Sequence, residues 1–189
     1  MKRVVIAVTG STGAIYGVRA LEICSEIREI ETHAVVSAGA EATLRIETRK
    51  TRDELKGKAD YFYEETDFEA PIASGSFQTT GMIIAPCSMK TLSSIATGYE
   101  NNLVSRAASV HLKERRPLVL LTRETPLSLI HLRNMVQVTE AGGIIMPPLP
   151  PLYFEMSDFG KMVDLTVARS LSLIGVETPF KKEWGKEKL

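Results

Sequence analysis

The chain has 189 residues, of which 44% are hydrophobic and 24% charged, the composition of an ordinary globular protein that can bury a sizeable core. Lysine plus arginine and aspartate plus glutamate each number 23, so the formal net charge is zero. This balance argues against a protein that binds nucleic acid through bulk positive charge, and it leaves little electrostatic resistance to self-association.

The chain start and the cysteines bear on the compartment. The N-terminus begins with a strand-like run and shows no signal-peptide pattern, and no stretch approaches the roughly 18 to 20 apolar residues of a membrane span. Cys24 and Cys87 have neither zinc-ligand spacing nor the number needed for a disulfide framework. We therefore expect two free thiols and a cytoplasmic protein.

Strand-like and helix-like segments alternate along the chain. Continuous apolar runs beside glycine or proline indicate strands buried on both faces. The expected strands cover residues 2–9, 32–37, 81–85 (ended by Pro86), 117–122 and 143–146. The expected helices cover residues 14–28, 38–48, 49–59, 91–116 with a break near Gly98, 126–141, and a last one from a Ser157 cap to about 174. Residues 64–77 are expected to form a loop.

This alternation predicts an α/β protein with a Rossmann-like (flavodoxin-like), doubly wound three-layer sandwich and a mostly parallel sheet. We expect one domain over residues 1–189, with a polar tail from about 176. Ligands of such sheets bind beyond the carboxyl ends of the strands. The candidate site is therefore sought in the loops that follow strands, at 10–13, 37–39, 86–91, 123–126 and 147–153.

The first of these loops, Gly10-Ser11-Thr12-Gly13, joins a strand to a helix. Glycines permit close backbone approach, hydroxyls donate hydrogen bonds, and helix N-terminal amides attract phosphate. The glycine spacing differs from the dinucleotide fingerprint, and no P-loop lysine follows. An ordinary glycine turn is the alternative, but the position favours a phosphorylated ligand.

The loop from Pro86 to Thr91 also joins a strand to a helix. Ser88 is a candidate helix cap and Thr91 can donate from the first turn, so capping and ligand binding are equally compatible with this loop. Cys87 has no identifiable base, and we expect a buried thiol rather than a nucleophile.

Charged residues flank two later elements. Residues 113–116 end a helix, where basic side chains usually interact with the helix dipole or with solvent. Arg123 and Glu124 follow a buried strand, where arginine can clamp phosphate and glutamate can relay a proton. Arg169 continues an apolar helical stripe, and a buried arginine needs an anionic partner, either a carboxylate or a ligand phosphate.

The histidines at positions 33, 111 and 131 lack metal-ligand spacing. We expect them to be structural, and we expect no metal site.

Read together, these segments resemble the UbiX family of flavin prenyltransferases. The resemblance runs from residues 8–17 (VTGSTGAIYG) to Trp184. It is most specific at residues 74–98 and 106–127, and residues 130–135 and the proline connector ending at Tyr153 add to it.

The resemblance implies an enzyme that joins a dimethylallyl unit, from dimethylallyl phosphate, to N5 and C6 of reduced FMN. The product, prenylated FMN, would serve partner decarboxylases of the UbiD type. Such enzymes need no metal and are homo-oligomers, commonly dodecamers, with sites at subunit interfaces. The residues leave open whether the monophosphate or the diphosphate is preferred.

Roles follow from the resemblance position by position. The residues implied to bind FMN are Gly10, Ser11, Thr12, Ser37, Ser88, Met89, Lys90, Thr91 and Arg123. Those implied to bind dimethylallyl phosphate are Lys113, Arg123, Tyr153 and Arg169. Glu47 and Glu124 match acidic residues implicated in phosphate handling and proton transfer, and Ser74 and Gly75 would face the site. The family's usual Gly-Ala-Ser-Gly loop reads Gly10-Ser11-Thr12-Gly13 here. The resemblance places the Thr12 hydroxyl, which carries an added methyl near the flavin, among the catalytic groups with Glu47 and Glu124.

Two other functions remain open at this point. One is a flavin-dependent decarboxylase of aromatic acids or peptidyl cysteine, although Tyr16 and Arg19 stand where a catalytic histidine would favour the cysteine enzymes. The other is a non-catalytic flavin carrier, which would not need a second phosphate site.

Overall fold

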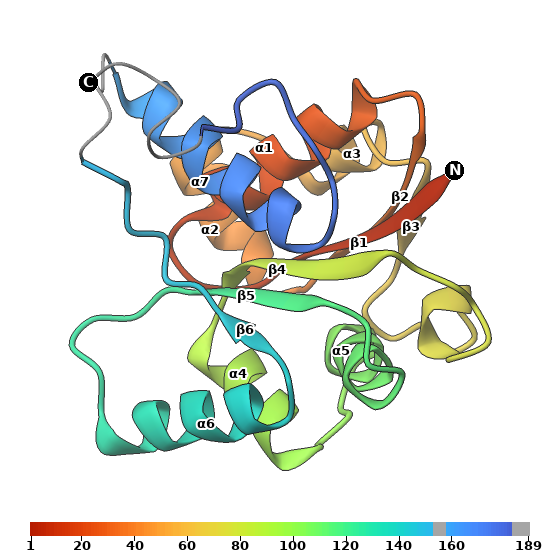
Figure 1. The fold of residues 1–189 in the computed structure, drawn as a ribbon, viewed down its shortest axis with the longest axis vertical. Coiled ribbons are helices and arrows are strands. Elements are labelled where there is room, and N and C mark those ends of the chain that lie inside the picture. The colour runs from red at the N-terminus through yellow and green to blue at the C-terminus, as the bar shows by residue number, and fades with distance from the viewer. Residues whose placement is uncertain (153–157, 183–189) are drawn as a thin grey trace.

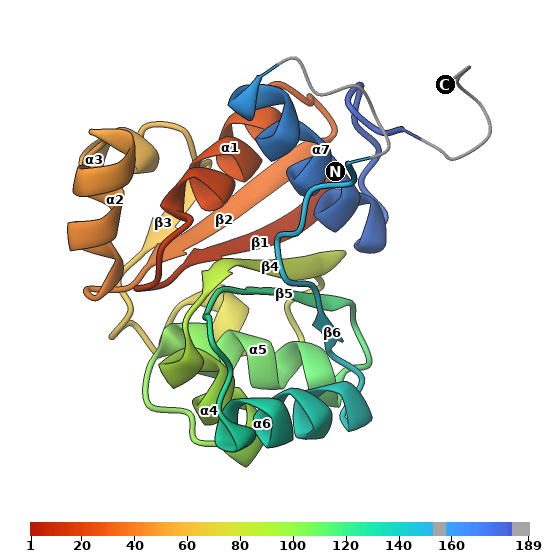
Figure 2. The same ribbon diagram turned by 90° about the vertical axis from the view of Figure 1, so that its left-hand side faces the viewer.

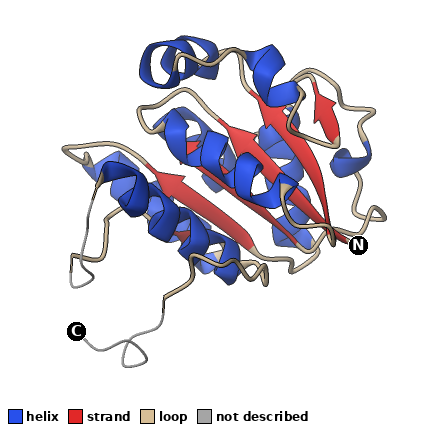
Figure 3. Cartoon of the chain, turned by 90° about the horizontal axis from the view of Figure 1, so that it is seen from above, coloured by secondary structure: helices blue, strands red, loops and turns tan. Residues whose placement is uncertain are grey.

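The computed structural model describes residues 1–152 and 158–182. Its centre is a six-stranded sheet with the order β3-β2-β1-β4-β5-β6, in which every neighbouring pair is parallel (Figure 1, Figure 3). The strands are β1 (Lys2–Val8), β2 (Ile30–Val36), β3 (Tyr61–Tyr63), β4 (Gly81–Cys87), β5 (Leu118–Thr122) and β6 (Ile144–Ile145). This is a doubly wound strand order of the Rossmann type, which confirms the predicted fold class.

Helices cover both faces of the sheet and complete three layers (Figure 2). One face carries α1 (Ala14–Ser25), α2 (Ala40–Thr48), α3 (Arg52–Lys56) and α7 (Phe159–Leu173). The other carries α4 (Met89–Thr97), α5 (Leu103–Lys113), α6 (Leu129–Glu140) and a short 3-10 turn, η1 (Pro71–Ala73). Along β1, Ile6 faces the first layer and Ala7 the second, so alternate residues supply two separate apolar cores.

Gly17 shows how tightly a helix packs on this sheet. A Cβ at this position of α1 would lie 2.2 Å from the carbonyl oxygen of Ala85 in β4. Only glycine therefore lets α1 approach the sheet this closely. Within the described ranges, no helix has both the length and the apolar character that crossing a membrane requires.

Several predicted boundaries change. Pro86 does not end its strand, because a bulge between Ile84 and Cys87 absorbs the residue that lacks an amide hydrogen. The short edge strand β3 was not predicted, since three residues carry too little pattern. The last helix is capped by Asp158, whose side chain accepts from the amide of Lys161, and the expected cap Ser157 lies outside the described residues.

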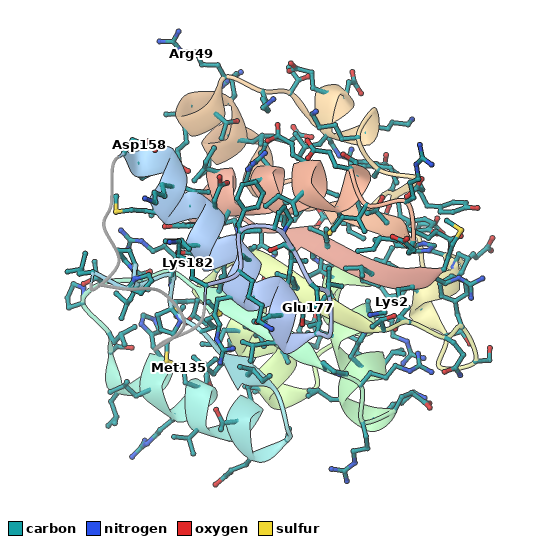
Figure 4. The ribbon with its side chains drawn as sticks, turned by 45° about the horizontal axis from the view of Figure 1, so that its top comes forward. Lys2, Arg49, Met135, Asp158, Glu177 and Lys182 are labelled. Atoms are coloured by element: carbon teal, nitrogen blue, oxygen red, sulfur yellow. The ribbon has the colours of Figure 1, made fainter. Side chains whose placement is uncertain are left out.

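The surface helix predicted over residues 49–59 is shorter in the structure. Arg49 ends α2 in a left-handed conformation with φ of 56° and points away from the molecule (Figure 4). Thr51 then caps the much shorter α3 by accepting from the amide of Glu54. The local capping signal therefore outweighs the helix propensity of the charged run.

Candidate functional site

The candidate site lies where the strand order reverses, beyond the carboxyl ends of β1 and β4. From these neighbouring strands the chain leaves toward α1 on one face and α4 on the other (Figure 2). A pocket of about 360 Å³ opens here, within the range of small-molecule sites. It is lined by Gly10, Ser11, Ser37, Ala38, Gly39, Glu65, Ser88, Met89, Lys90, Thr91, Asn102 and Glu124.

The first loop offers this pocket a close backbone and a free hydroxyl. A Cβ on Gly10 would lie 2.5 Å from the carbonyl oxygen of Gly39, so position 10 has no room for a side chain. The Ser11 Oγ is buried and has no hydrogen-bond partner among the described residues. Buried hydroxyls are almost always paired, so this orphaned atom in a pocket wall fits a site whose bound ligand supplies the partner.

The second loop presents the N-terminus of α4. The Ser88 side chain accepts from the amide of Thr91 at 3.3 Å and donates to its hydroxyl at 3.1 Å. Lys90, in the first turn, is exposed at the pocket. First-turn amides without intrahelical partners and a nearby ammonium group both favour an anion such as phosphate.

Glu65 and Asn102 are pocket residues that the sequence did not reveal. Glu65 Oε1 accepts from the amide of Ala38 at 2.9 Å, and Oε2 accepts from Asn102 Nδ2 at 3.0 Å. Glu65 thus ties the loop after β2 to the start of α5. It lies in the stretch that was expected to be an irregular loop, where no periodicity distinguishes one carboxylate from another.

The position of Glu47 changes the role expected for the helix end that follows the first glycine loop. Its Oε2 accepts from the amides of Gly13 at 2.8 Å and Ala14 at 2.9 Å, so the N-terminus of α1 already holds an anionic group from this chain. The N-terminal amides of α1 were predicted to attract phosphate, and here they serve a carboxylate of α2 instead. Thr12 is exposed and is not among the residues that line the pocket.

Arg123 and Glu124 follow β5 at the same edge of the sheet. Arg123 is half-buried, and its amide donates to the carbonyl oxygen of Cys87 at 3.2 Å. Burial raises the pKa of Tyr16, and the positive charge of nearby Arg123 opposes part of that rise. Arg123 therefore lies close to Tyr16, beside the pocket that Glu124 lines.

Lys113 does not join these residues within one chain. α5 begins at the pocket and ends at Lys113, about 16 Å further along the helix axis. There Lys113 pairs with Glu114, and a Cβ on Gly75 would lie 2.5 Å from its Nζ. Ser74 and Gly75 lie in a loop that packs near Lys113, at the amino ends of the strands, and they do not reach the pocket of their own chain. Their expected place facing a site between subunits stays a prediction.

Arg169 is also remote from the pocket and is not buried. It is exposed in the last turns of α7, where Nη1 donates to Ser172 Oγ at 3.4 Å. α7 ends beside Gly81, at the start of β4. The apolar stripe reaches solvent at position 169, so Arg169 does not need the anionic partner that a buried arginine would require. Tyr153 and Trp184 lie outside the described residues.

The thiols and buried histidines have structural surroundings. Burial raises the pKa of the Cys87 thiol, which makes it a poor nucleophile. His111 is held by Thr79 and the carbonyl oxygen of Ala107, and burial lowers its pKa to about 4. Across the described ranges, no group of three or more His, Cys, Asp or Glu side chains is placed to hold a metal ion.

The family model and the most similar curated proteins point to the same family. The family model described as Flavoprotein matches residues 1–171. The chain is 48% identical over 184 residues to the flavin prenyltransferase UbiX of Neisseria meningitidis, covering 97% of each chain. It is 50% identical over 182 residues to a probable UbiX-like flavin prenyltransferase of Bacillus subtilis, covering 96% of this chain and 89% of the relative.

Solved structures agree with these relatives. A protein described as AnUbiX, crystallised with FMN and dimethylallyl pyrophosphate, superposes with a TM-score of 0.94 at 45% identity over 99% of both chains. A dodecameric FMN-dependent UbiX-like decarboxylase from Escherichia coli superposes with a TM-score of 0.92 at 44% identity, over 97% of this chain and 99% of that one.

Proposed function

Because this chain belongs to the UbiX family of flavin prenyltransferases, we propose that it transfers a dimethylallyl group from dimethylallyl phosphate to N5 and C6 of reduced FMN, which yields prenylated FMN. The observation that best supports this function is the pocket at the reversal of strand order, where the buried Ser11 hydroxyl has no partner among the described residues. The chain also superposes on a relative that was crystallised with FMN and dimethylallyl pyrophosphate. Support for FMN thus comes from this chain's own pocket as well as from its relatives.

Several residues of the pocket are suited to hold FMN. We assign its binding to Gly10, Ser11, Thr12, Ser37, Ser88, Met89, Lys90, Thr91 and Arg123. All of these except Thr12 and Arg123 line the pocket, and those two lie beside it in the chain. When bound, reduced FMN supplies an electron-rich ring for bond formation to carbon. The chain supplies hydroxyl and amide donors, the Lys90 charge and a backbone that fits closely around the ligand.

The prenyl donor must lose its phosphate. In the proposed reaction, the allyl carbon C1 bonds to flavin N5 and the allyl carbon C3 bonds to flavin C6. The C1–O bond breaks and phosphate leaves with the electron pair. The protons on N5 and C6 are lost, and one proton is added at C2, where the double bond is consumed. Without a metal, cations and hydrogen-bond donors have to stabilise that leaving group. We assign this role to Lys113, Arg123, Tyr153 and Arg169, and we assign proton transfer to Glu124. Glu47 supports the reaction by holding the turn before α1.

The separation of these cations within one chain supports a site shared between copies. Lys113 and Arg169 lie toward the amino ends of the strands, whereas Arg123 follows β5 at the carboxyl ends. We propose that another subunit of a homo-oligomer brings Lys113 or Arg169 to the pocket. A relative at 44% identity is dodecameric, and we propose the same assembly here.

The product is a cofactor rather than an end product. We propose that prenylated FMN passes to a UbiD-type decarboxylase, and that the exchange takes place in the cytoplasm. Both proposals follow from membership of the family. We also propose that the chain forms a single domain over residues 1–189, with a polar tail from about 176.

The test is a single-turnover reaction without oxygen. Purified protein, chemically reduced FMN and either dimethylallyl monophosphate or diphosphate are incubated, and the extracted flavin is analysed by mass spectrometry. We expect a flavin with the mass of one added prenyl unit. Recovery of unmodified FMN with both donors would reject the prenyltransferase function.

Decarboxylation is the second candidate, because a solved relative at 44% identity is described as an FMN-dependent decarboxylase. The matched reaction replaces the prenyl donor with an aromatic acid and measures carbon dioxide. Release of carbon dioxide without flavin modification would favour this alternative. The cysteine decarboxylase TvaF, at 15% identity and a TM-score of 0.66, shows only that the fold is shared. A simple FMN carrier would give neither product.

A further inference from the structure

Thr9, directly after β1, makes a buried bridge that the proposed reaction does not use. It is 1% exposed, and its Oγ1 donates to the carbonyl oxygen of Pro86 at 2.8 Å and accepts from the amide of Ser88 at 2.8 Å. These roles are fixed, because a carbonyl oxygen only accepts and a backbone amide only donates. The amide of Thr9 also donates to the carbonyl oxygen of Pro86, at 3.2 Å.

The bridge spans the point where two neighbouring strands separate. β1 and β4 stay in parallel register as far as Ala7 and Ile84. Beyond these residues the two connections diverge toward α1 and α4, on opposite faces of the sheet (Figure 2). Thr9 makes three hydrogen bonds across this point, two to the carbonyl oxygen of Pro86 near the end of β4 and one from the amide of Ser88 just after it.

Both ends of the bridge carry pocket residues. Ser11 follows closely in the chain, and its amide donates to the carbonyl oxygen of Thr9 at 2.9 Å. Ser88, whose amide Thr9 holds, caps α4 and lines the opposite wall of the pocket. The relative position of these two serines therefore depends on the Thr9 hydroxyl.

We propose that Thr9 is a positioning residue that sets the spacing between the two ligand-binding loops. This inference rests on the proposed function, because that function identifies the ligand as FMN. Donors that are already held in place bind more tightly, because less ordering remains to be done when the ligand arrives. Thr9 touches no ligand in this arrangement and acts through the backbone on either side of it.

The test compares Thr9→Val, which keeps the shape and removes the hydroxyl, with Thr9→Ser, which keeps the hydroxyl. FMN binding is measured by titrating flavin fluorescence, and the bound flavin is examined by visible circular dichroism. We expect the dissociation constant to rise about tenfold in Thr9→Val, the factor that corresponds to one hydrogen bond, and to stay within about threefold in Thr9→Ser. The dichroism of the flavin bound to Thr9→Val should also change.

Thr32 offers a matched control for loss of a buried hydroxyl. It is fully buried, donates to Asp60 Oδ2 at 2.8 Å and accepts from the amide of Asp60 at 2.9 Å, near the amino ends of β2 and β3 and away from the pocket. Thr32→Val should lower the unfolding temperature and leave the FMN dissociation constant unchanged. Equal FMN affinity in the two valine variants would overturn the positioning role.

Two further measurements cover a variant that folds poorly and a wild-type chain that does not bind FMN. If Thr9→Val folds poorly, Thr9→Cys replaces it, since a thiol keeps the volume but forms weaker hydrogen bonds. The FMN dissociation constant of Thr9→Cys should be higher than those of the wild type and of Thr9→Ser, and a wild-type value would overturn the proposal. If the wild-type chain itself fails to bind FMN, the failure belongs to the proposed function and is recognised before any variant is compared.

Discussion

Glu47 Oε2 lies 2.8 Å from the amide nitrogen of Gly13, so a carboxylate from α2 occupies the anion-binding end of α1. The same oxygen accepts from Ala14, and Gly13 itself has φ of 102°. Two segments far apart in the sequence are thereby fixed to each other beside the pocket. The turn before α1 is shaped by the protein's own negative charge, which leaves the α4 end as the better place for a phosphate.

The first prediction tests that interaction by removing only the charge. Glu47→Gln keeps an acceptor oxygen but loses its attraction to the helix N-terminus. We expect the free energy of unfolding to fall by about 0.5 to 1 kcal/mol in urea denaturation at low salt. Glu29→Gln, an exposed change in the turn before β2, is the control and should have no effect. A similar loss in both variants would contradict the specific role of Glu47.

The second prediction is that removing the Ser11 hydroxyl weakens FMN binding without lowering the stability of the ligand-free protein. Its Oγ is buried without a partner in the described part of the chain, so Ser11→Ala should leave the ligand-free protein as stable as wild type or slightly more stable. FMN affinity should nevertheless fall by about tenfold, because the ligand loses one hydrogen bond. Thermal unfolding without FMN and fluorescence titration with FMN measure the two effects.

Thr178→Val is the control for Ser11→Ala. The Thr178 Oγ1 is also buried and without a partner among the described residues, but it lies outside the pocket. Its removal should leave FMN affinity unchanged. Unchanged affinity in Ser11→Ala would mean that the orphaned hydroxyl does not meet the ligand.

The third prediction concerns acid stability and His111. Burial lowers its pKa in the folded protein to about 4, below the unfolded value of about 6.5. Between these values the unfolded chain binds a proton that the folded chain does not, so the free energy of unfolding decreases as the pH falls. The full difference amounts to about 3 kcal/mol between pH 7 and pH 4.

Urea denaturation at several pH values checks this dependence. His111→Gln should be less stable at neutral pH, because two buried partners are disturbed, but its stability should vary less with pH. His131→Gln, at the partly exposed start of α6, is the control and should keep the wild-type slope. A wild-type slope in His111→Gln would assign the acid sensitivity to other groups, such as the buried His33, whose pKa is also lowered by burial.

Much of the fold is predictable from the chain because its signals are local. The apolar run at Val4–Val8 and the glycine loop after it place β1 and α1 within a few residues. Pro86 misleads, since the bulge that accommodates it depends on pairing with β5. β3 is recognised only through its partner β2, because its three residues have no period of their own.

The site is less predictable than the fold because its members are joined by tertiary contacts. Gly10, Ser11 and Ser88 follow strands, and the rule for parallel sheets finds them. Glu65 enters the pocket from an irregular segment, and nothing in the sequence marks its contact with Ala38. The bridge from Thr9 is also invisible in the sequence, since a threonine that ends a strand is ordinary there.

The fourth prediction concerns assembly through α6. Several large apolar side chains of this helix face solvent in the single chain, including Leu129 at 60%, Ile130 at 68% and Val136 at 55% exposed. An apolar surface of this kind on a family member with a dodecameric relative fits a contact between subunits. Ile130→Asp should therefore reduce the assembly to smaller species in analytical ultracentrifugation and keep the helical circular dichroism. Gln137→Asp, an exposed polar change on the same helix, is the control, and equal assembly of both variants would contradict the contact.

The fifth prediction tests whether one active site draws on two chains. Within one chain, Lys113 lies near the amino ends of the strands and Arg123 follows the carboxyl end of β5. A shared site would take these two residues from different chains, and a variant that lacks either residue should be inactive. The Lys113→Ala and Arg123→Ala chains are co-expressed with different tags and purified as mixed oligomers. In a random mixture, about a quarter of the sites between two chains receive a native Lys113 from one chain and a native Arg123 from the other. The mixed oligomers should therefore regain about a quarter of the wild-type prenylation activity. Each variant alone measures the baseline. Mixed oligomers with no more activity than that baseline would show that both residues act within a single chain.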